Sequence, residues 1–270
     1  MQTVNRPVME IDNISLTSSF LGREVLVDLY YPRGLNPSGE LDLLLINDGQ
    51  NMEEMGLADM LADQWVRKGI QSWFTVAVHA GTARKMEYGV AGIPDYLERG
   101  ALAGHYTSFI LSELLPYLYD RLGISHFRQS AFAGFSLGGL SALDICWNHP
   151  DLFKYAGIFS GSLWWRSLDQ KDPAYHDQLH RIMHQVIRHG HAKPGLKFFF
   201  QCGNQDETMD RNNNGIIDSI DDTLDMIAEL ERKGYMRGRD IEYLEMSDGK
   251  HDVPTWGRAM PVFLEWIGRR

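Results

Sequence analysis

The spacing of hydrophobic and polar positions along the chain changes repeatedly between the period of a strand and the period of a helix. Residues 24–31 (EVLVDLYY) alternate apolar and polar side chains, which predicts a half-buried strand ending at Pro32. Short apolar runs predict further, buried strands at 41–47, 71–79, 131–135, 155–159, 196–202 and 241–246. Apolar residues at helical spacing predict helices at 51–68, 105–122, 136–148, 174–188, 220–233 and 255–269.

Strands that alternate with helices in this way require crossover connections, which favour a parallel sheet covered on both faces. The predicted fold class is therefore α/β, with three layers and a mostly parallel central sheet between helices. No linker rich in Ser, Gly or Pro interrupts the pattern, so we expect residues 1–270 to form a single domain.

Charge and cysteine content narrow the range of partners and compartments. The 26 Lys and Arg against 36 Asp and Glu give a net charge of −10, which disfavours nucleic acid and anionic membranes as partners. Cys146 and Cys202 are too few for a disulfide framework, so two buried free thiols are expected. The N-terminal residues lack the apolar segment of a signal peptide, and no apolar run is long enough to span a bilayer. We therefore expect a cytoplasmic protein.

A glycine-rich turn carries the strongest chemical signal in the chain. Residues 134–139 (GFSLGG) lie between a predicted strand and a predicted helix. A GxSxG sequence in this context is typical of a nucleophilic serine, held in a strained backbone that the flanking glycines tolerate. Ser136 is the predicted nucleophile. The N–H of Leu137 has no partner at the start of the helix, so it is a predicted oxyanion donor.

A serine hydroxyl needs an imidazole to take its proton and a carboxylate to orient that imidazole. In hydrolases with this turn, the acid and then the histidine follow the serine on loops after later strands. His251, between the last predicted strand and the last helix, is the predicted base. The loop after the preceding strand offers Asp206, which we favour as the acid, with Glu207 and then Asp210 as alternatives. The histidines expected on the solvated surface are His126, His149, His176, His180, His184, His189 and His191.

Four segments together resemble the esterase-D-like α/β-hydrolases: LLLINDGQNM, FAGFSLGGLSAL, IFSGSLWW and GKHDVPTWGRAMPVFLEWI. Within that family they are most similar to the catalytic domains of enterochelin esterases, and feruloyl esterases, acetyl-xylan esterases and mycolyl acyltransferases share the same frame. The resemblance implies an α/β-hydrolase fold and a triad of Ser136, Asp206 and His251. It also implies that Gln50 supplies a second oxyanion N–H beside that of Leu137, in keeping with the two donors that a developing oxyanion needs.

These observations predict a serine carboxylic-ester hydrolase that acts on a small-molecule ester through an acyl-enzyme and needs no cofactor for catalysis. Two alternatives stay open: acyl transfer to an alcohol other than water, and an inactive binding module stabilised by calcium. The adjacent Trp164 and Trp165 follow a predicted strand, so either they line an acyl or aromatic pocket or they pack in the core.

Residues 210–221 (DRNNNGIIDSID) match the pattern of an EF-hand calcium loop, except that aspartate replaces glutamate at the last position, as in dockerin-type loops. Hard oxygen ligands alternate along the loop, and Gly215 stands where the pattern needs a sharp turn. The predicted ligands are Asp210, Asn212, Asn214, the carbonyl of Ile216, Asp218 and Asp221. We expect a structural Ca²⁺ beside the acid loop; the alternative is an acidic surface turn that caps the following helix.

Overall fold

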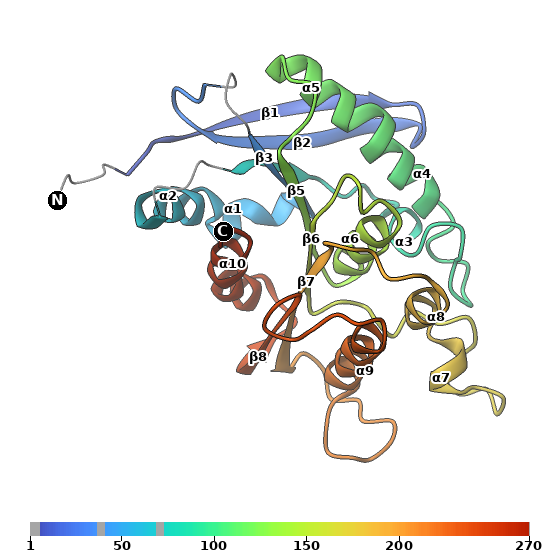
Figure 1. Cartoon of the computed structure of the whole chain (residues 1–270). Coiled ribbons are helices and arrows are strands. Elements are labelled where there is room, and N and C mark those ends of the chain that lie inside the picture. The colour runs from blue at the N-terminus through green and yellow to red at the C-terminus, as the bar shows by residue number, and fades with distance from the viewer. Residues whose placement is uncertain (1–5, 37–40, 69–72, 270) are drawn as a thin grey trace.

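One eight-stranded sheet, in the order β1-β2-β4-β3-β5-β6-β7-β8, organises the chain (Figure 1). The computed structural model describes residues 6–36, 41–68 and 73–269. The strands are β1 (Met9–Ser18), β2 (Arg23–Pro32), β3 (Asp42–Asn47), β4 (Trp73–Val78), β5 (Gln129–Phe135), β6 (Tyr155–Phe159), β7 (Lys197–Gln205) and β8 (Ile241–Lys250). β2 pairs antiparallel with β1 and β4, and all other pairings are parallel. The predicted α/β class with a mostly parallel sheet is confirmed.

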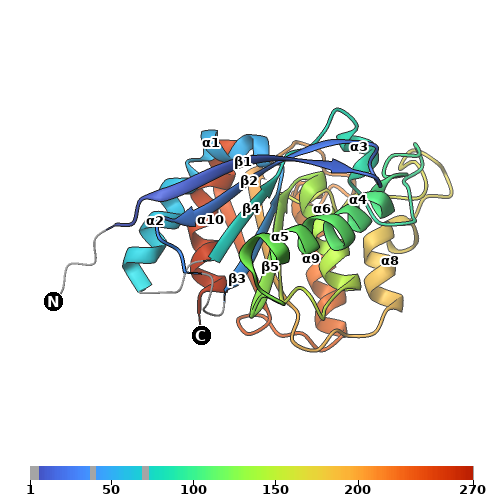
Figure 2. The same cartoon turned by 90° about the horizontal axis from the view of Figure 1, so that it is seen from above.

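Helices cover both faces of this sheet and complete three layers (Figures 1 and 2). The helical segments are η1 (Gly49–Asn51), α1 (Met52–Met55), α2 (Leu57–Lys68), α3 (Arg84–Glu87), α4 (Ala103–Phe109), η2 (Ile110–Leu114), α5 (Leu115–Leu122), α6 (Leu137–Asn148), α7 (Asp177–His180), α8 (Ile182–His189), α9 (Asp218–Arg232) and α10 (Val253–Ile267). One apolar cluster lies between the sheet and α1, α2 and α10, and a larger one lies beneath α4, α5, α6, α8 and α9. No helix within the described residues has the length and apolar character to cross a bilayer.

The observed elements differ from the predicted ones where local sequence is ambiguous. Strand β1 was not predicted; it is an edge strand whose residues are mostly half-buried or exposed, so its apolar pattern is weak. The predicted helix 51–68 divides at Gly56, which has a left-handed φ of 74°. The predicted helix 174–188 is instead two short helices, α7 and α8. Of the predicted strand 71–79, Gln71 and Ser72 lie outside the described residues.

Two predictions about individual side chains have different outcomes. Cys146 and Cys202 are buried free thiols, as expected. The prediction that His184 is solvated is wrong, because it is 1% exposed and its Nε2 lies 2.9 Å from the carbonyl oxygen of Asp222. Burial lowers the pKa of His184 to about 3, so the ring is neutral in the fold. His184 lies on the buried side of α8 with Met183 and Ile187, and the helical spacing in the sequence did not separate this position from an exposed one.

Candidate active site

The turn between β5 and α6 holds Ser136 in a strained conformation. Its φ is 55° and its ψ is −121°, which is unfavourable for a side chain with a Cβ. The turn is tight because a Cβ added at Gly134 would lie 2.3 Å from the carbonyl of Gly138. The Ser136 N–H donates to the carbonyl of Phe159 at 2.9 Å, which anchors the turn to the neighbouring strand β6. The turn therefore presents the Ser136 hydroxyl at the carboxyl edge of the sheet.

A cleft of about 400 Å³ opens above this turn. Five of the residues predicted from the sequence line it together: Ser136, Leu137, Trp164, Asp206 and His251. Leu137 is the first residue of α6, so its N–H has no carbonyl partner within the helix and is available to an oxyanion. The cleft thus brings together a serine hydroxyl, an imidazole, a carboxylate and a free backbone N–H, the groups that acyl transfer requires.

Asp206 lies on the loop that follows β7. Both of its carboxylate oxygens are buried, and neither has a partner with hydrogen-bond geometry among the described residues. Burial raises the pKa of Asp206, while the nearby Ser160 hydroxyl, the Gly203 N–H and the His251 ring favour its charged form. A buried carboxylate with free acceptor capacity beside an imidazole is suited to orient that imidazole and to stabilise its cation.

Glu207 lines the same cleft but has different electrostatic neighbours. Burial raises the pKa of Glu207, and the carboxylates of Asp218 and Asp222 raise it further, whereas the Ser219 N–H lowers it. These neighbours belong to the start of α9. The electrostatic contact with His251 belongs to Asp206, which favours Asp206 as the acid.

His251 lies directly after β8, and the next residue, Asp252, caps α10 by accepting a hydrogen bond from the Thr255 N–H at 2.9 Å. The ring packs edge-on against Trp256, with 5.3 Å between ring centroids. Desolvation within the cleft lowers the pKa of His251; the Asp206 carboxylate opposes this shift, and the Arg84 guanidinium adds to it. Desolvation thus favours the neutral form of the ring, which is the form that accepts a proton.

The lowered pKa predicts the acid limb of the pH profile. Only neutral His251 accepts a proton, so we expect kcat/KM to fall with a midpoint below the ordinary imidazole value of about 6.5. The rate of methyl butyrate hydrolysis in a pH-stat measures this limb. In Asp206→Asn, the residual activity should have its midpoint at still lower pH, because the carboxylate that raises the pKa of His251 is gone. A wild-type midpoint above about 7 would contradict this account.

Gln50, the second predicted oxyanion donor, follows β3 in the short helix η1. Its backbone N–H stands at the first turn of that helix, where donors are free of intrahelical partners. Its side chain lies in a neighbouring pocket, not in the cleft: Oε1 accepts from the Ala80 N–H at 3.0 Å, and Nε2 donates to Asp48 at 3.2 Å. These two bonds fix the conformation of the loop that carries the Gln50 N–H.

An ion pair that the sequence analysis missed joins this loop to the nucleophile turn. Arg84 donates to both carboxylate oxygens of Asp48, at 2.6 and 2.7 Å, and to the carbonyl of Phe135 at 3.3 Å. Asp48 has a left-handed φ of 64°, and its carboxylate lies so close to Gly138 that a Cβ there would be 2.7 Å away. We call Asp48 and Arg84 the clamp. No local motif indicates Arg84, since its partners are distant in the sequence.

Two serines on the loop after β6 were also missed as individual residues. The Ser162 Oγ lies 3.2 Å from the Ser136 Oγ, and the Ser162 N–H donates to the carbonyl of Ser136 at 3.1 Å. Ser160 has a positive φ of 44°, and its Oγ accepts from the indole N–H of Trp256 at 3.0 Å. The sequence contained only the pattern Ser-Gly-Ser after a strand, which does not reveal contacts across the cleft.

The two adjacent tryptophans have different positions. Trp164 is half-buried and lines the cleft, with the guanidinium of Arg99 5.0 Å from its ring and that of Arg166 5.7 Å away. Trp165 is fully buried in the core, where its ring prevents a Cβ at Gly100. Only Trp164 is therefore in a position to contact a substrate in this cleft.

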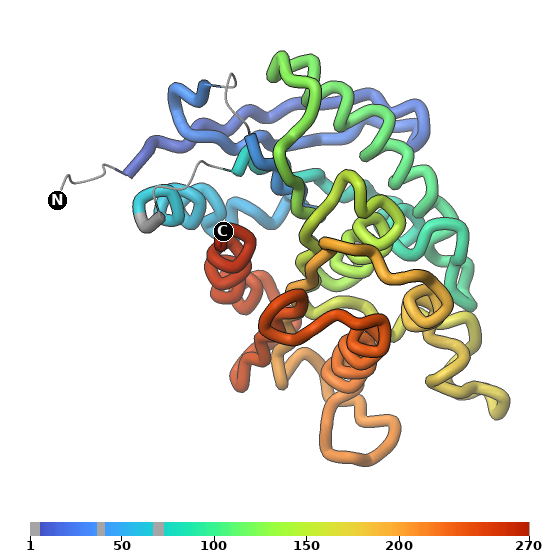
Figure 3. Tube along the Cα trace, viewed as in Figure 1, coloured from blue at the N-terminus to red at the C-terminus, as the bar shows by residue number. Residues whose placement is uncertain are grey.

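The loop of residues 210–217 projects from the molecule between β7 and α9 (orange in Figure 3). The Asp210 carboxylate accepts from the N–H groups of Asn214 and Gly215 at 3.1 and 2.9 Å, as expected of a tightly curled loop. Asp221 accepts from the side-chain amides of Asn212 and Asn214, at 2.8 and 2.9 Å. Four predicted ligand residues, Asp210, Asn212, Asn214 and Asp221, are thus linked by hydrogen bonds.

Asp218 differs from the other predicted ligands. Its carboxylate accepts from the backbone N–H of Arg211 at 2.8 Å and pairs with its guanidinium at 3.3 Å. The same guanidinium bridges Asp177 and Asp222. Within the described part of the chain, no three His, Cys, Asp or Glu side chains form a group that could hold a metal ion. An ion in this loop would depend on asparagine and backbone oxygens in addition to carboxylates.

Known proteins share both the sequence pattern and the fold. The sequence profile of the family described as "Putative esterase" matches residues 18–267. A diacylglycerol acyltransferase/mycolyltransferase (Ag85A) from Mycobacterium leprae is 27% identical over 164 residues, which are 60% of this chain and 47% of that protein. The chain thus spans about half the length of the curated relatives it matches.

Solved structures with the same fold are more distant in sequence. The enterobactin esterase of Shigella flexneri superposes with a TM-score of 0.72 at 21% identity, over 96% of this chain and 58% of that one. A ferulic acid esterase superposes with a TM-score of 0.71 at 19% identity, over 98% and 99% of the two chains.

Proposed function

This chain belongs to the putative esterase family, and on that basis we propose that it hydrolyses carboxylic esters through an acyl-enzyme on Ser136. The observation that carries the proposal is the strained Ser136 at the edge of a cleft that Asp206 and His251 also line. A binding module has no need of this strain, which costs free energy in the folded state.

In the proposed reaction, His251 takes the hydroxyl proton of Ser136 as Oγ attacks the ester carbonyl. The carbonyl oxygen becomes an oxyanion that accepts hydrogen bonds from the N–H groups of Leu137 and Gln50. The imidazolium, stabilised by Asp206, returns the proton to the leaving alcohol, and the acyl group stays on Ser136. A water molecule, deprotonated by His251, then attacks the acyl-enzyme, and the acid and free Ser136 are released.

The lining of the cleft supports an ester with an aromatic acyl group. Trp164 offers a partly exposed ring, and the exposed Lys85 and the guanidinium of Arg99 lie in the same lining. Aromatic contacts contribute about 0.5–1.5 kcal/mol beyond the area that they bury, and cations near the ring suit hydroxyl or carboxylate substituents. The ferulic acid esterase among the solved structures is named for an aromatic acid of this class.

Acyl transfer to an alcohol is the second candidate, because the curated relatives are named as acyltransferases. The two reactions share every step up to the acyl-enzyme and differ in the molecule that attacks it. The product formed from an ester in the presence of a competing alcohol distinguishes them.

A comparison of two esters tests the proposal and its substrate class. With methyl ferulate or methyl butyrate and added glycerol, we expect the free acid as the main product, and we expect Trp164→Ala to lower kcat/KM about tenfold for ferulate only. Methyl butyrate is the control for damage to the triad. A glyceryl ester as the main product would establish acyl transfer, and equal losses for both esters would exclude Trp164 as an aromatic contact.

For the loop at 210–221 we propose a structural Ca²⁺. The chain would hold it through Asp210, Asn212, Asn214, the Ile216 carbonyl and Asp221, while Asp218 stays with Arg211. The left-handed backbone at Asn213 and Gly215 and the alternation of oxygen side chains support this donor set. Calcium would replace the hydrogen bonds that Asp221 accepts from the side-chain amides of Asn212 and Asn214. It would thereby tie the start of α9 to the loop that follows Asp206.

Chelation should therefore lower the melting temperature. At a hundredfold excess of free Ca²⁺ over Kd, binding stabilises the fold by about 2.7 kcal/mol, or roughly 5 °C or more for a chain of this size. Calorimetry in EGTA and after adding back Ca²⁺ or Mg²⁺ measures this effect, and Ca²⁺ should restore the melting temperature better. Asp221→Asn should reduce the effect, while Asp248→Asn, at an exposed ion pair outside the loop, should leave it. Identical melting curves with and without EGTA, for protein first stripped of metal, would leave the loop as a helix cap.

A further inference from the structure

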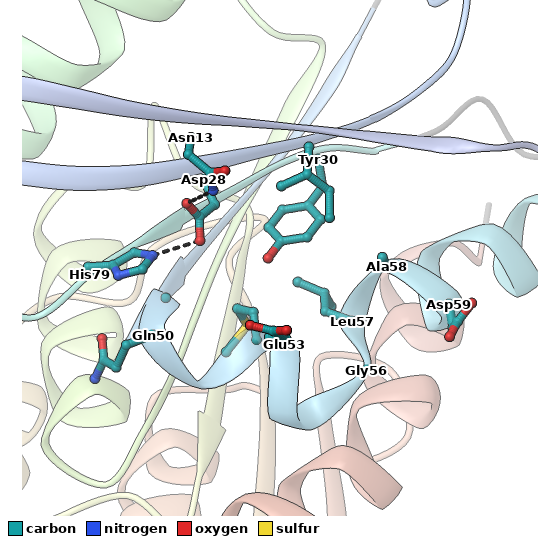
Figure 4. Close-up of a pocket in the computed structure, with 13 residues that line it drawn as sticks. Asn13, Asp28, Tyr30, Gln50, Glu53, Gly56, Leu57, Ala58, Asp59 and His79 are labelled. Carbon is teal, nitrogen blue, oxygen red and sulfur yellow. Dashed lines mark hydrogen bonds and ion pairs between the residues drawn. The ribbon is translucent and has the colours of Figure 1, made fainter.

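A second pocket, of about 470 Å³, shares no lining residue with the catalytic cleft. It lies between the hairpin of β1 and β2 and the helix α1 (Figure 4). Its lining includes the apolar side chains of Met52 and Leu57, and polar side chains that come from β1, β2, η1, α1, α2 and the residue after β4. Of its lining, the proposed reaction uses only the backbone N–H of Gln50.

Tyr30 places an unpartnered hydroxyl in this pocket. The residue is only 4% exposed, and its hydroxyl has no hydrogen-bond partner among the described residues. Figure 4 shows the ring extending from β2 with its hydroxyl directed toward α1, between Asp28 and Leu57. The hydroxyl opens onto the pocket, so a ligand bound there can take the hydrogen bond that no described residue supplies.

The carboxylates that line the pocket determine which charge a ligand there can carry. Asp28 is 8% exposed and is held by Asn13 Nδ2 and His79 Nε2, each 2.6 Å from one of its oxygens. Glu53 is exposed at the rim, facing the same space (Figure 4). Burial raises the pKa of Tyr30 to about 12, and the Asp28 and Glu53 charges contribute to the shift. The site therefore disfavours an anion and favours a cation.

The cation is organic rather than a metal ion. Across the described residues, no three His, Cys, Asp or Glu side chains could coordinate a metal together. The polar atoms of the pocket are instead spread around a cavity with an apolar floor, which suits a ligand with a charged end and a hydrocarbon chain.

We propose that this pocket binds a small alkylammonium cation. Its N–H groups donate to the Tyr30 hydroxyl oxygen and to the carboxylates of Asp28 and Glu53. Its hydrocarbon chain lies against Met52 and Leu57, which removes apolar surface from water. The residues that would bind the cation, Asp28, Tyr30 and Glu53, have no part in the proposed ester chemistry.

The probe is n-butylammonium, with 1-butanol as its uncharged counterpart. In protein labelled with ¹³C at the methionine methyl groups, the Met52 resonance, assigned through Met52→Leu, should shift saturably with a Kd of about 1 mM. Tyr30→Phe and Glu53→Gln should each weaken binding about tenfold, because each removes a hydrogen bond to a charged group. Glu54→Gln is the matched control on the same helix, outside the pocket lining, and should change the Kd less than about twofold.

A second measurement separates binding from folding. Tyr30→Phe should melt no lower than the wild type, because the lost hydroxyl has no protein partner, and the exposed Glu53→Gln should also fold normally. Binding of 1-butanol as tight as that of the amine would overturn the proposal. So would an unsaturated response at about 100 mM amine, or an unchanged Kd in the Glu53→Gln variant.

Discussion

Replacing Ser136 with alanine is expected to lower kcat by about 10⁶-fold, because the nucleophile and the acyl-enzyme are lost together. Wild-type protein should react with a fluorophosphonate at this residue alone, and the variant should not react. Intact-mass and peptide mass spectrometry measure the labelling, and a pH-stat measures the residual ester hydrolysis.

Ser162→Ala is the matched control, since its hydroxyl lies 3.2 Å from that of Ser136 in the same cleft. This variant should still be labelled at Ser136. Both residues carry a hydroxyl in the same cleft, so either could in chemical terms be the nucleophile. Only the strained turn distinguishes Ser136. Labelling that persists in Ser136→Ala and disappears in Ser162→Ala would transfer the role to Ser162.

Asp206→Asn is expected to lower kcat by about 10⁴-fold while the protein stays folded. The amide retains the shape of the carboxylate but cannot stabilise the imidazolium of His251, and it favours the wrong tautomer of the ring. Steady-state kinetics with methyl butyrate measures the loss, and calorimetry verifies the fold.

Glu207→Gln is the control next to it in the chain and in the cleft. Its electrostatic neighbours are Asp218 and Asp222 rather than His251, so we expect a loss of less than about tenfold. A larger loss in Glu207→Gln than in Asp206→Asn would assign the acid to Glu207.

The parts of the fold that the sequence predicts are those with a strong local signal. The strand–turn–helix around Ser136 is local, because its glycines, its serine and the apolar strand before it are consecutive. The parallel strands β3 to β7 are recognisable because burial on both faces requires continuous apolar runs. The edge strand β1 is not buried on both faces, so its half-polar pattern did not identify it as a strand. A single glycine within a helical pattern, such as Gly56, does not by itself show that the helix breaks there.

The contacts that shape the candidate site are mostly long-range, and a sequence pattern cannot contain them. The clamp joins a residue after β3 to one in α3, and Ser162 meets Ser136 only because β6 lies beside β5. The calcium pattern has the same limit, because it counts Asp218 as a ligand but gives no sign that Arg211 pairs with it. Trp164 and Trp165 are chemically identical neighbours, and only packing separates them.

The clamp affects the temperature at which the enzyme loses activity. It ties the loop after β3, the helix α3 and the nucleophile turn into one cooperative unit at the centre of the sheet. Catalytic sites built on mobile loops open locally at a small fraction of the global unfolding free energy. Here the nucleophile turn and the loop after β3 are joined by part-buried ionic contacts at the sheet centre, which have to break before the two separate. Loss of activity on heating should therefore coincide with the melting of the sheet rather than precede it.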